Sequence, residues 1–213
     1  MAAVNTKKNK RIEQGDRSKE EILDAAMRIM AVKGYDGTSI SLLAKECGLP
    51  ASSIYWHFSS KAGVLHAVME REGSRFLSST APDKLAEGGT PSSRIGRMTQ
   101  VYEQAVAAIQ EHPEFLRILF LLTLSAPADG ANEAASRLRI DGKEQLRESI
   151  RYVYSDLHPD QASIVADELI DLALATFDGL FISAQNSPAM PRNLIAKVAK
   201  SLTSLGDEIA AEL

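Results

Sequence analysis

Residues 50–61 hold side chains whose types and spacing suit them to binding a polyanion. Ile54 and Phe58 stand four positions apart, which places both on one inward face of a helix of about two turns. The opposite face is polar and aromatic, and it consists of Ser52, Ser53, Trp56 and His57. Trp56 and the neighbouring Tyr55 each combine a large apolar body with one hydrogen-bond donor, so they can pack on a deoxyribose and bond its phosphate. This chemistry indicates contact with nucleic acid.

Lys61 is a further candidate for anion binding, because it lies at or just inside the start of the next predicted helix. A cation at that end opposes the helix macrodipole, which favours anions there. A bound phosphate would relieve the conflict, since a helix N-terminus and a lysine together make an anion site. The alternative for this region is that Tyr55 and Trp56 are partly buried core aromatics and that Lys61 is a solvated charge.

The segment before residue 50 is predicted to form the partner helix of this element. Apolar residues at positions 40, 43 and 44 repeat at helical spacing, and either Thr38 or Ser39 can cap the start. Gly48 suits the left-handed position that follows a helix end. Two helices joined by a short turn containing glycine form a helix-turn-helix, whose second helix can enter the major groove of DNA.

The stretch from about Lys19 to Met69 resembles the N-terminal domain of the TetR family of bacterial transcriptional regulators. Several spaced features carry the resemblance. They are Lys33-Gly34-Tyr35 at the end of the first helix, Gly37-Thr38-Ser39, Leu43-Ala44-Lys45, Gly48-Leu49, the run Ile54-Tyr55-Trp56-His57-Phe58, and Lys61 with Leu65. The remainder of the chain resembles the family only in having helices of the right number and length.

The resemblance implies roles for individual positions. The positions that match contacts to phosphates or sugars are Thr38, Tyr55, Trp56, His57 and Lys61. The positions that match contacts to base edges are Ser41, Ala51, Ser52 and Ser53. These side chains are small, which implies specificity through few direct hydrogen bonds, methyl contacts and DNA shape.

Three residues depart from the family pattern. Pro50 stands where the family often has a capping Ser or Thr, so the recognition helix is open to a shift of one residue at its start. Ser52 replaces a common Gly, and Ser41 is shorter than the basic residue that some members use for a guanine.

Charge is distributed unevenly along the chain. Residues 1–80 hold 12 Lys and Arg against 9 Asp and Glu, a net charge of +3, whereas residues 81–213 hold 12 against 19, a net charge of −7. A positive region on an acidic body concentrates the attraction for nucleic acid at one end.

Size and composition bound the remaining possibilities. With 213 residues and 45% hydrophobic content, the chain can bury a substantial core in one or two domains. Apolar runs such as 115–124 are too short to span a bilayer, and no signal peptide is recognisable, so we expect a cytoplasmic protein without a membrane partner. The single cysteine, Cys47, excludes an intrachain disulfide and is interpreted as a small buried hydrophobe.

The predicted fold is all-α, with an N-terminal three-helix DNA-binding domain that contains the helix-turn-helix and a larger C-terminal helical domain for ligand binding and dimerisation. Residues 1–17 are interpreted as a flexible basic arm, residues 18–77 as the DNA-binding domain with the connecting fourth helix, and residues 78–213 as the C-terminal domain. Ser18-Lys19-Glu20-Glu21 reads as a capping box that starts the first helix. Beyond a loop at 78–91, helices are predicted at about 92–111, 114–125, 131–156, 160–185 and 191–212.

The last two helices have broad apolar faces, which intrachain packing could absorb in large part. These faces carry Leu169, Leu172, Thr176 and Leu180 on one helix, and Leu194, Val198, Leu202, Leu205 and Ile209 on the other. The family's usual dimer packs two such helix pairs into a four-helix bundle, and we prefer that interpretation.

A ligand cavity is a further expectation for the C-terminal domain, and ordinary core is the favoured alternative for each lining residue, because no periodicity distinguishes a pocket from a packed interior. The candidates are Met98, Val101, Tyr102, Phe115, Leu119, Leu122, Tyr152, Phe177 and Phe181.

No constellation of residues points to an enzyme, a cofactor or a metal. The four histidines lack metal-ligand spacing, and no phosphate-binding loop or nucleophile motif is present. We therefore expect a homodimeric repressor that binds a palindromic DNA operator and is released by a small, mainly apolar molecule. The alternatives are an activator of the same fold, a regulator controlled by a partner protein, and a pure protein-interaction module.

Overall fold

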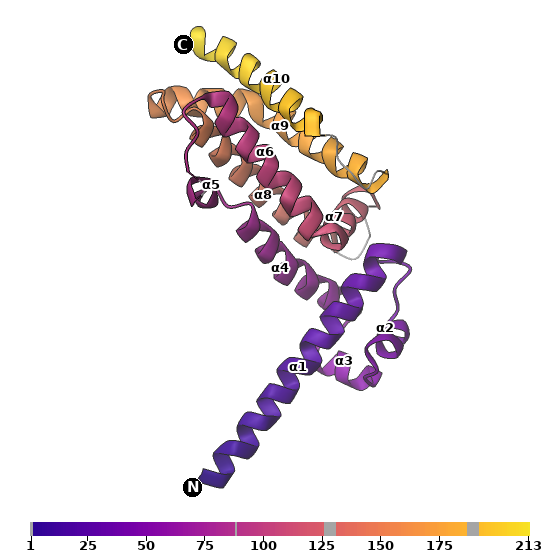
Figure 1. Cartoon of the computed structure of the whole chain (residues 1–213). Helices are drawn as coiled ribbons and strands as arrows, with labels where there is room; N and C mark the ends of the chain where they lie inside the picture. The colour runs from indigo at the N-terminus through magenta and orange to yellow at the C-terminus, as the bar shows by residue number, and fades with distance from the viewer. Residues whose placement is uncertain (1, 88, 126–130, 187–191) are drawn as a thin grey trace. The chain divides into compact units, whose positions relative to one another are not determined.

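The structure of the chain is a computed structural model that describes residues 2–87, 89–125, 131–186 and 192–213 (Figure 1). Every regular element in these ranges is an α-helix, which confirms the predicted all-α class. Within the same ranges, no helix combines the length and the apolar character needed to cross a membrane.

The chain divides into two compact units. Unit 1 comprises residues 1–74 and 113–137, and unit 2 comprises residues 75–112 and 138–213. The predicted division near residue 78 agrees with the first crossing point, but it differs for residues 113–137, which belong to the unit that contains the helix-turn-helix.

Helix α1 spans Ala2–Lys33, so residues 2–17 of the predicted basic arm form the first part of this helix. The predicted capping box is wrong, because Ser18 lies inside the helix and its hydroxyl donates to the Gln14 carbonyl at 2.9 Å. The physical reason is that Ala, Lys, Gln, Glu and Arg dominate on both sides of Ser18, and these residues favour continuation of a helix. The inner face of α1 includes Ile22, Ala25 and Ala26, which are fully buried.

The helix-turn-helix consists of α2 (Ile40–Cys47) and α3 (Ala51–Phe58). Ser39 caps α2 by accepting a hydrogen bond from the Leu42 amide at 3.2 Å, and Gly48 has the left-handed conformation expected after its end, with φ of 71°. Pro50 precedes α3 without any side-chain cap, and α3 begins directly at Ala51. Both α2 and α3 pack on α1.

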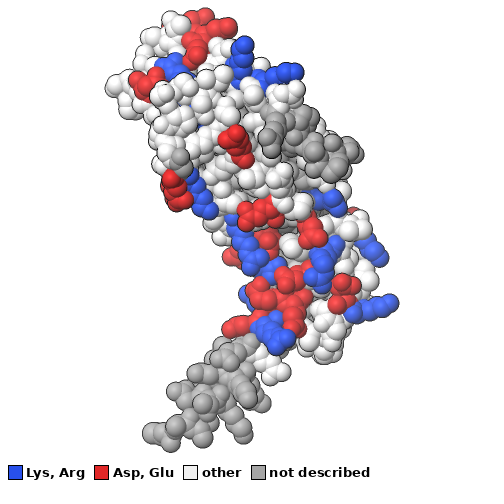
Figure 2. Space-filling model, in the orientation of Figure 1, with Lys and Arg blue, Asp and Glu red and all other residues white. Residues whose placement is uncertain are grey.

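Arg71 of helix α4 (Lys61–Ser79) links this helix to α1. Arg71 donates to Glu20 at 2.6 Å, to Asp24 at 2.7 Å and to the buried carboxylate of Glu72 at 2.7 Å. Its pKa is raised by the hydrogen bonds to Glu20 and Asp24, although burial opposes the shift. Figure 2 shows charged side chains of both signs crowded where α1 and α4 meet. Helix α7 (Pro113–Ser125) completes unit 1 by packing on α1.

Unit 2 is built on α6 (Arg94–Glu111), α9 (Pro159–Asn186) and α10 (Arg192–Ala211), which pack on one another. The buried Tyr102 of α6 donates its hydroxyl to the Ala173 carbonyl of α9 at 3.1 Å. The short α5 (Asp83–Glu87) lies within the segment predicted as loop, and α8 (Ala131–Val153) contributes to both units. Helices α6, α7, α9 and α10 begin and end within a few residues of the bounds predicted from the sequence.

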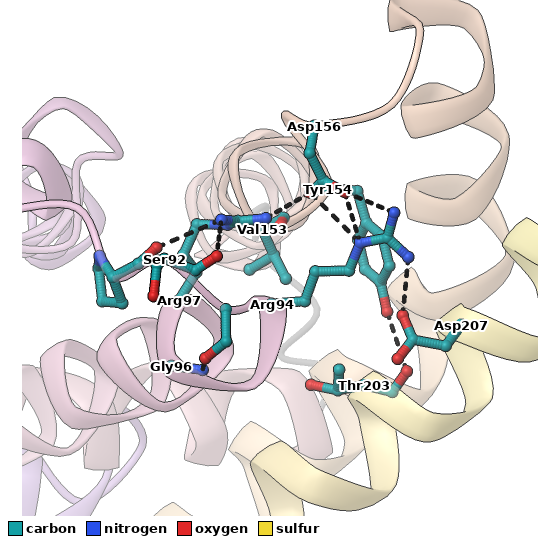
Figure 3. Close-up of polar contacts among 11 residues, drawn as sticks. Ser92, Arg94, Gly96, Arg97, Val153, Tyr154, Asp156, Thr203 and Asp207 are labelled. Carbon is teal, nitrogen blue, oxygen red and sulfur yellow. Dashed lines mark hydrogen bonds and ion pairs between the residues drawn. The ribbon is translucent and has the colours of Figure 1, made fainter.

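Two arginines tie the first turn of α6 to the end of α8 (Figure 3). The buried Arg97 donates to the Val153 carbonyl at 2.7 Å and pairs with Asp156. Arg94 donates to both oxygens of Asp156, at 2.6 and 3.2 Å for the shortest bond to each. The hydrogen bond from Arg94 lowers the pKa of Asp156, so this carboxylate stays charged.

The same cluster fixes α10. Arg94 also donates to Asp207 of α10 at 2.9 Å, and its guanidinium lies 5.0 Å from the ring centroid of Tyr154. The hydroxyl of Tyr154 donates to the Thr203 carbonyl of α10 at 3.2 Å (Figure 3). Burial raises the pKa of this hydroxyl, which therefore remains a donor. The position of α10 along α6 is set by these contacts.

Candidate DNA-binding surface

The recognition helix α3 buries one face and exposes the other as predicted. Ile54 and Phe58 are buried, while 53% of Tyr55 and 77% of Trp56 are exposed. The Trp56 ring packs edge-on against His57 with 4.6 Å between centroids. Two large aromatic side chains with free polar ends thus stand on the outer side of the domain. The alternative that both are core residues does not fit this exposure.

The four positions matched to base contacts lie on the same two helices. Ser41 of α2 and Ser52 of α3 are exposed, and Ala51 and Ser53 are half-buried at the start of α3. Their side chains are short, so contact with base edges would require the first turn of α3 to come close to the floor of the major groove.

Thr38 differs from the other matched positions because it is buried. Only 2% of the residue is exposed, and its hydroxyl donates to the Gly34 carbonyl at 2.8 Å. Its backbone amide donates to the Tyr35 carbonyl at 3.1 Å. A direct contact between Thr38 and a phosphate requires these groups to exchange partners. In the free protein, Thr38 instead closes the turn from which Ser39 caps α2.

Lys61 has an internal partner that the sequence did not indicate. Its ammonium group donates to the Tyr35 carbonyl at 3.0 Å and lies 4.0 Å from the centroid of the Tyr35 ring. The carbonyl and the ring relieve part of the conflict between this cation and the start of α4. An ammonium group has three donors, so further donors are available for a phosphate.

His57 lies where α3 comes close to α1. Its pKa is lowered, first by burial and then by the positive charge of Lys19, while Asp16 acts in the opposite direction. The imidazole of the free protein is therefore neutral near pH 7. A phosphate placed beside it would favour the protonated form.

Three residues that contribute to this surface were not predicted as contributors. Tyr35 accepts a hydrogen bond from Lys61 through its carbonyl oxygen. Ser39 caps α2, for which the sequence left Thr38 and Ser39 as alternatives. The positive charge of Lys19 lowers the pKa of His57. Gly34-Tyr35 after an amphipathic helix was visible in the sequence, but nothing local linked it to a lysine 26 residues later.

The nine residues predicted to line a ligand cavity are divided between the units. Phe115, Leu119 and Leu122 are buried in unit 1. The other six, which lie in unit 2, are Met98, Val101, Tyr102, Tyr152, Phe177 and Phe181. The nine candidates thus belong to two units that are described separately, and the ligand cavity stays a prediction.

Within unit 2, polar and aromatic groups gather around two of these residues. Tyr152 donates its hydroxyl to Gln100 at 3.1 Å, and the Phe177 ring lies 6.3 Å from that of Phe76. Phe76 in turn packs edge-on against His112 with 6.0 Å between ring centroids, and the buried Nε2 of His112 has no hydrogen-bond partner among the described residues. These groups were not predicted, because none of them shows helical periodicity with the apolar candidates.

The sequence model described as "Bacterial regulatory proteins, tetR family" matches residues 22–68. The transcriptional regulator AcrR of Shigella flexneri is 31% identical over 58 residues, which cover 27% of each chain. The negative regulator of the biofilm operon icaADBC, IcaR of Staphylococcus aureus, is 39% identical over 46 residues, which cover 22% of this chain and 25% of IcaR. The chain thus aligns with about a quarter of the length of these relatives.

Solved structures extend the similarity of fold to most of the chain. A TetR-family regulator from Streptomyces coelicolor superposes with a TM-score of 0.63 at 16% identity, over 93% of this chain and 84% of the other. The fatty acid degradation regulator FadR of Bacillus halodurans superposes with a TM-score of 0.61 at 16% identity, over 86% and 93%. An N-terminal helix-turn-helix followed by a helical C-terminal part is therefore the shared architecture.

Proposed function

Because the chain belongs to the TetR family of bacterial transcriptional regulators, we propose that it is a repressor that binds a near-palindromic operator as a homodimer. The observation that supports DNA binding most strongly is the exposed face of α3, where Tyr55 and Trp56 stand beside Ser52 and His57. Repression is favoured over activation because IcaR, which shares the helix-turn-helix region, is a negative regulator.

Gel-shift and anisotropy titrations with duplex DNA from upstream of the protein's own gene test this proposal. Trp56→Ala should weaken binding to all duplexes by about 1–3 kcal/mol, as expected for a packed phosphate contact. Leu124→Ala is the matched control, because Leu124 is also a large exposed side chain of unit 1, with 81% exposure, and lies outside α3. An equal effect of both variants would contradict the assigned surface, as would binding that does not weaken with added salt.

The proposed dimer uses the outer faces of α9 and α10. Leu172, Ile182 and Leu205 are large apolar side chains that unit 2 leaves exposed. Over these two helices, Figure 2 shows mostly uncharged surface. Two such helix pairs, one from each subunit, would form a four-helix bundle. To read a near-palindrome, the two recognition helices of this dimer must lie about 34–36 Å apart, one turn of B-DNA.

The face predicted from the sequence needs adjustment, because Leu169, Leu180 and Leu202 are buried within unit 2. A charge at Leu202 would therefore test the core rather than the interface. Leu172→Glu and Leu205→Glu are the informative changes, and each should give monomers in sedimentation analysis. Leu124→Glu is the control that should leave the assembly unchanged, and persistence of the dimer in both interface variants would refute this arrangement.

The proposed effector is a small, mainly apolar molecule bound in the C-terminal part. The support is the apolar character of the predicted lining residues, and control by a partner protein remains the alternative. Such a ligand must prefer a conformation with wrongly spaced recognition helices by about 10⁴-fold, roughly 5.5 kcal/mol, to shift the population from 1:99 to 99:1. Phe177→Trp should then blunt release by an effector while operator binding persists. An unchanged response would place the ligand elsewhere.

A further inference from the structure

The recognition helix α3 is joined to α4 by only two residues, Ser59 and Ser60, and they form a tight turn. Ser59 has a φ of 61°, and it is the only non-glycine residue with a positive φ in the described ranges. The Ser60 amide donates to the carbonyl of Phe58, two residues earlier, at 2.6 Å. A three-residue turn with a positive φ at its centre is rare and strained, and it persists only where the surrounding structure imposes it.

Gly63, in the first turn of α4, makes room for this turn. A Cβ atom built on Gly63 would overlap the carbonyl oxygen of Phe58 and would lie 3.2 Å from the carbonyl carbon. The backbone of Gly63 is helical and its φ is not positive. Space, and not backbone conformation, therefore requires glycine at this position. The last carbonyl of α3 thus lies closer to α4 than a residue with a side chain at position 63 would allow.

Other contacts hold the two helices on either side of this turn. The side chain of Phe58 is buried, and α3 packs on α1 and α2. Ser60 caps α4 by accepting a hydrogen bond from the Gly63 amide at 3.0 Å. Lys61 is tied to the Tyr35 carbonyl of α1 at 3.0 Å. A methyl group added at position 63 must therefore displace the end of α3 relative to the start of α4, or break one of these contacts.

The proposed phosphate contacts of the domain lie on both sides of the turn. Those of α3 are Tyr55, Trp56 and His57. Lys61 belongs to α4. Phosphate contacts fix the register of a protein on the duplex, so both sets can bind together only if the two helices are correctly spaced.

We propose that Gly63 is a positioning residue for DNA binding. By admitting the close approach of the Phe58 carbonyl, it sets the distance from Lys61 to the contacts of α3 without touching the duplex itself. The inference rests on the proposed DNA binding of α3.

The test compares duplex binding by the parent protein, Gly63→Ala, Lys61→Met and the double variant between about 50 and 200 mM salt. Gly142→Ala is the matched control, because it makes the same change inside α8, where an added Cβ meets nothing within 4 Å. A further variant has one glycine inserted between the exposed Ser59 and Ser60. It lengthens the turn without adding a side chain, so it decides the question if Gly63→Ala does not fold. Circular dichroism monitors folding throughout.

Gly63→Ala should bind about tenfold more weakly at low salt, and its slope of log K against log salt should fall by about 0.9, as for one lost phosphate contact. Lys61→Met should add little to this loss, because Lys61 no longer reaches its phosphate in the Gly63→Ala background. Trp56 is the only tryptophan of the chain, and its fluorescence should still change at saturating duplex, since α3 keeps its own contacts. The insertion variant should show the same losses, and Gly142→Ala should show none.

Parental affinity and salt slope in a folded Gly63→Ala or in the insertion variant would overturn the inference. An equal loss from Lys61→Met in the parent and in Gly63→Ala would also overturn it, because Gly63 would then serve only the stability of the domain. If the parent itself bound no duplex, the proposed function would fail. If Trp56→Ala lost binding while Gly63→Ala bound like the parent, only this inference would fail.

Discussion

Gly206 is the position where one added methyl group tests how closely α10 packs in unit 2. A Cβ atom there would lie 2.0 Å from the Tyr154 hydroxyl oxygen, 2.6 Å from its Cζ and 2.9 Å from Leu169 Cδ1. The Tyr154 ring cannot move aside freely, because it is fully buried, lies against Arg94 and donates to the Thr203 carbonyl. Gly206→Ala must therefore displace either Tyr154 or α10.

The expected cost follows from three contributions. Overpacking a core by one methyl costs about 1–3 kcal/mol. Loss of the Tyr154 hydrogen bond costs about 1 kcal/mol, and the higher helix propensity of Ala returns about 0.5–1 kcal/mol. The net loss in unfolding free energy is about 2 kcal/mol, which lowers the melting temperature of a chain of this size by about 4–8 °C.

Urea and thermal unfolding measure this difference against Gly142→Ala. Gly142 lies inside α8 with no atom within 4 Å of an added Cβ, so that variant should be stabilised by about 0.5–1 kcal/mol. Tyr154→Phe removes the 2.0 Å contact, so the double variant with Gly206→Ala should lose less than the sum of the single losses. If Gly206→Ala were as stable as Gly142→Ala, α10 would not pack on Tyr154 as described.

The remaining predictions concern the DNA-binding surface. In NMR titrations, Lys19→Gln should raise the pKa of His57, because the positive charge that lowers it is gone. An unchanged pKa would mean that the charge of Lys19 does not act on His57. Because a phosphate favours protonated His57, DNA affinity should increase as the pH falls from 8 to 6, and His57→Gln should remove this dependence. Lys61→Met should lower the unfolding free energy by about 1–3 kcal/mol through its lost bond to Tyr35 and should also reduce the salt slope of DNA binding. Tyr35→Leu should also destabilise the fold, but it should leave the salt slope of DNA binding unchanged. If Tyr35→Leu reduced this slope as much as Lys61→Met does, the slope would depend on the fold, and Lys61 would contact no phosphate of its own.

Local sequence patterns predicted the helix-turn-helix well. The cap and end of α2 depend on single residues, Ser39 and Gly48, whose conformational preferences act over one or two neighbours. The inner face of α3 needs only the four-residue spacing of Ile54 and Phe58. The contact between Lys61 and Tyr35 depends on how α4 begins beside the end of α1, and no local pattern encodes it.

The start of α1 and the outer face of α10 show why other predictions failed. Ser18 followed by Glu21 satisfies the pattern of a capping box, yet strong helix formers before Ser18 outweigh it. Leu202 and Leu205 are both apolar and nearly a turn apart, but only 2% of Leu202 is exposed against 38% of Leu205. Periodicity shows that a helix has an apolar side. Which of its residues face the same chain depends on the tertiary contacts of α6 and α9.

The two kinds of DNA contact proposed for the helix-turn-helix would have different consequences for regulation. Phosphate contacts carry no sequence information, so those proposed for Tyr55, Trp56 and Lys61 would strengthen operator and random duplex by the same factor. Contacts of Ser53 with base edges would strengthen the operator alone. An effector that changes the spacing of the recognition helices prevents both subunits from contacting their base edges at once, but the phosphate contacts of one subunit could still hold the duplex. Complete release would then require that the sequence-independent affinity be weak at cellular salt. The net charge of −8 on residues 20–213 acts in that direction, because it repels the duplex once the recognition helices no longer fit.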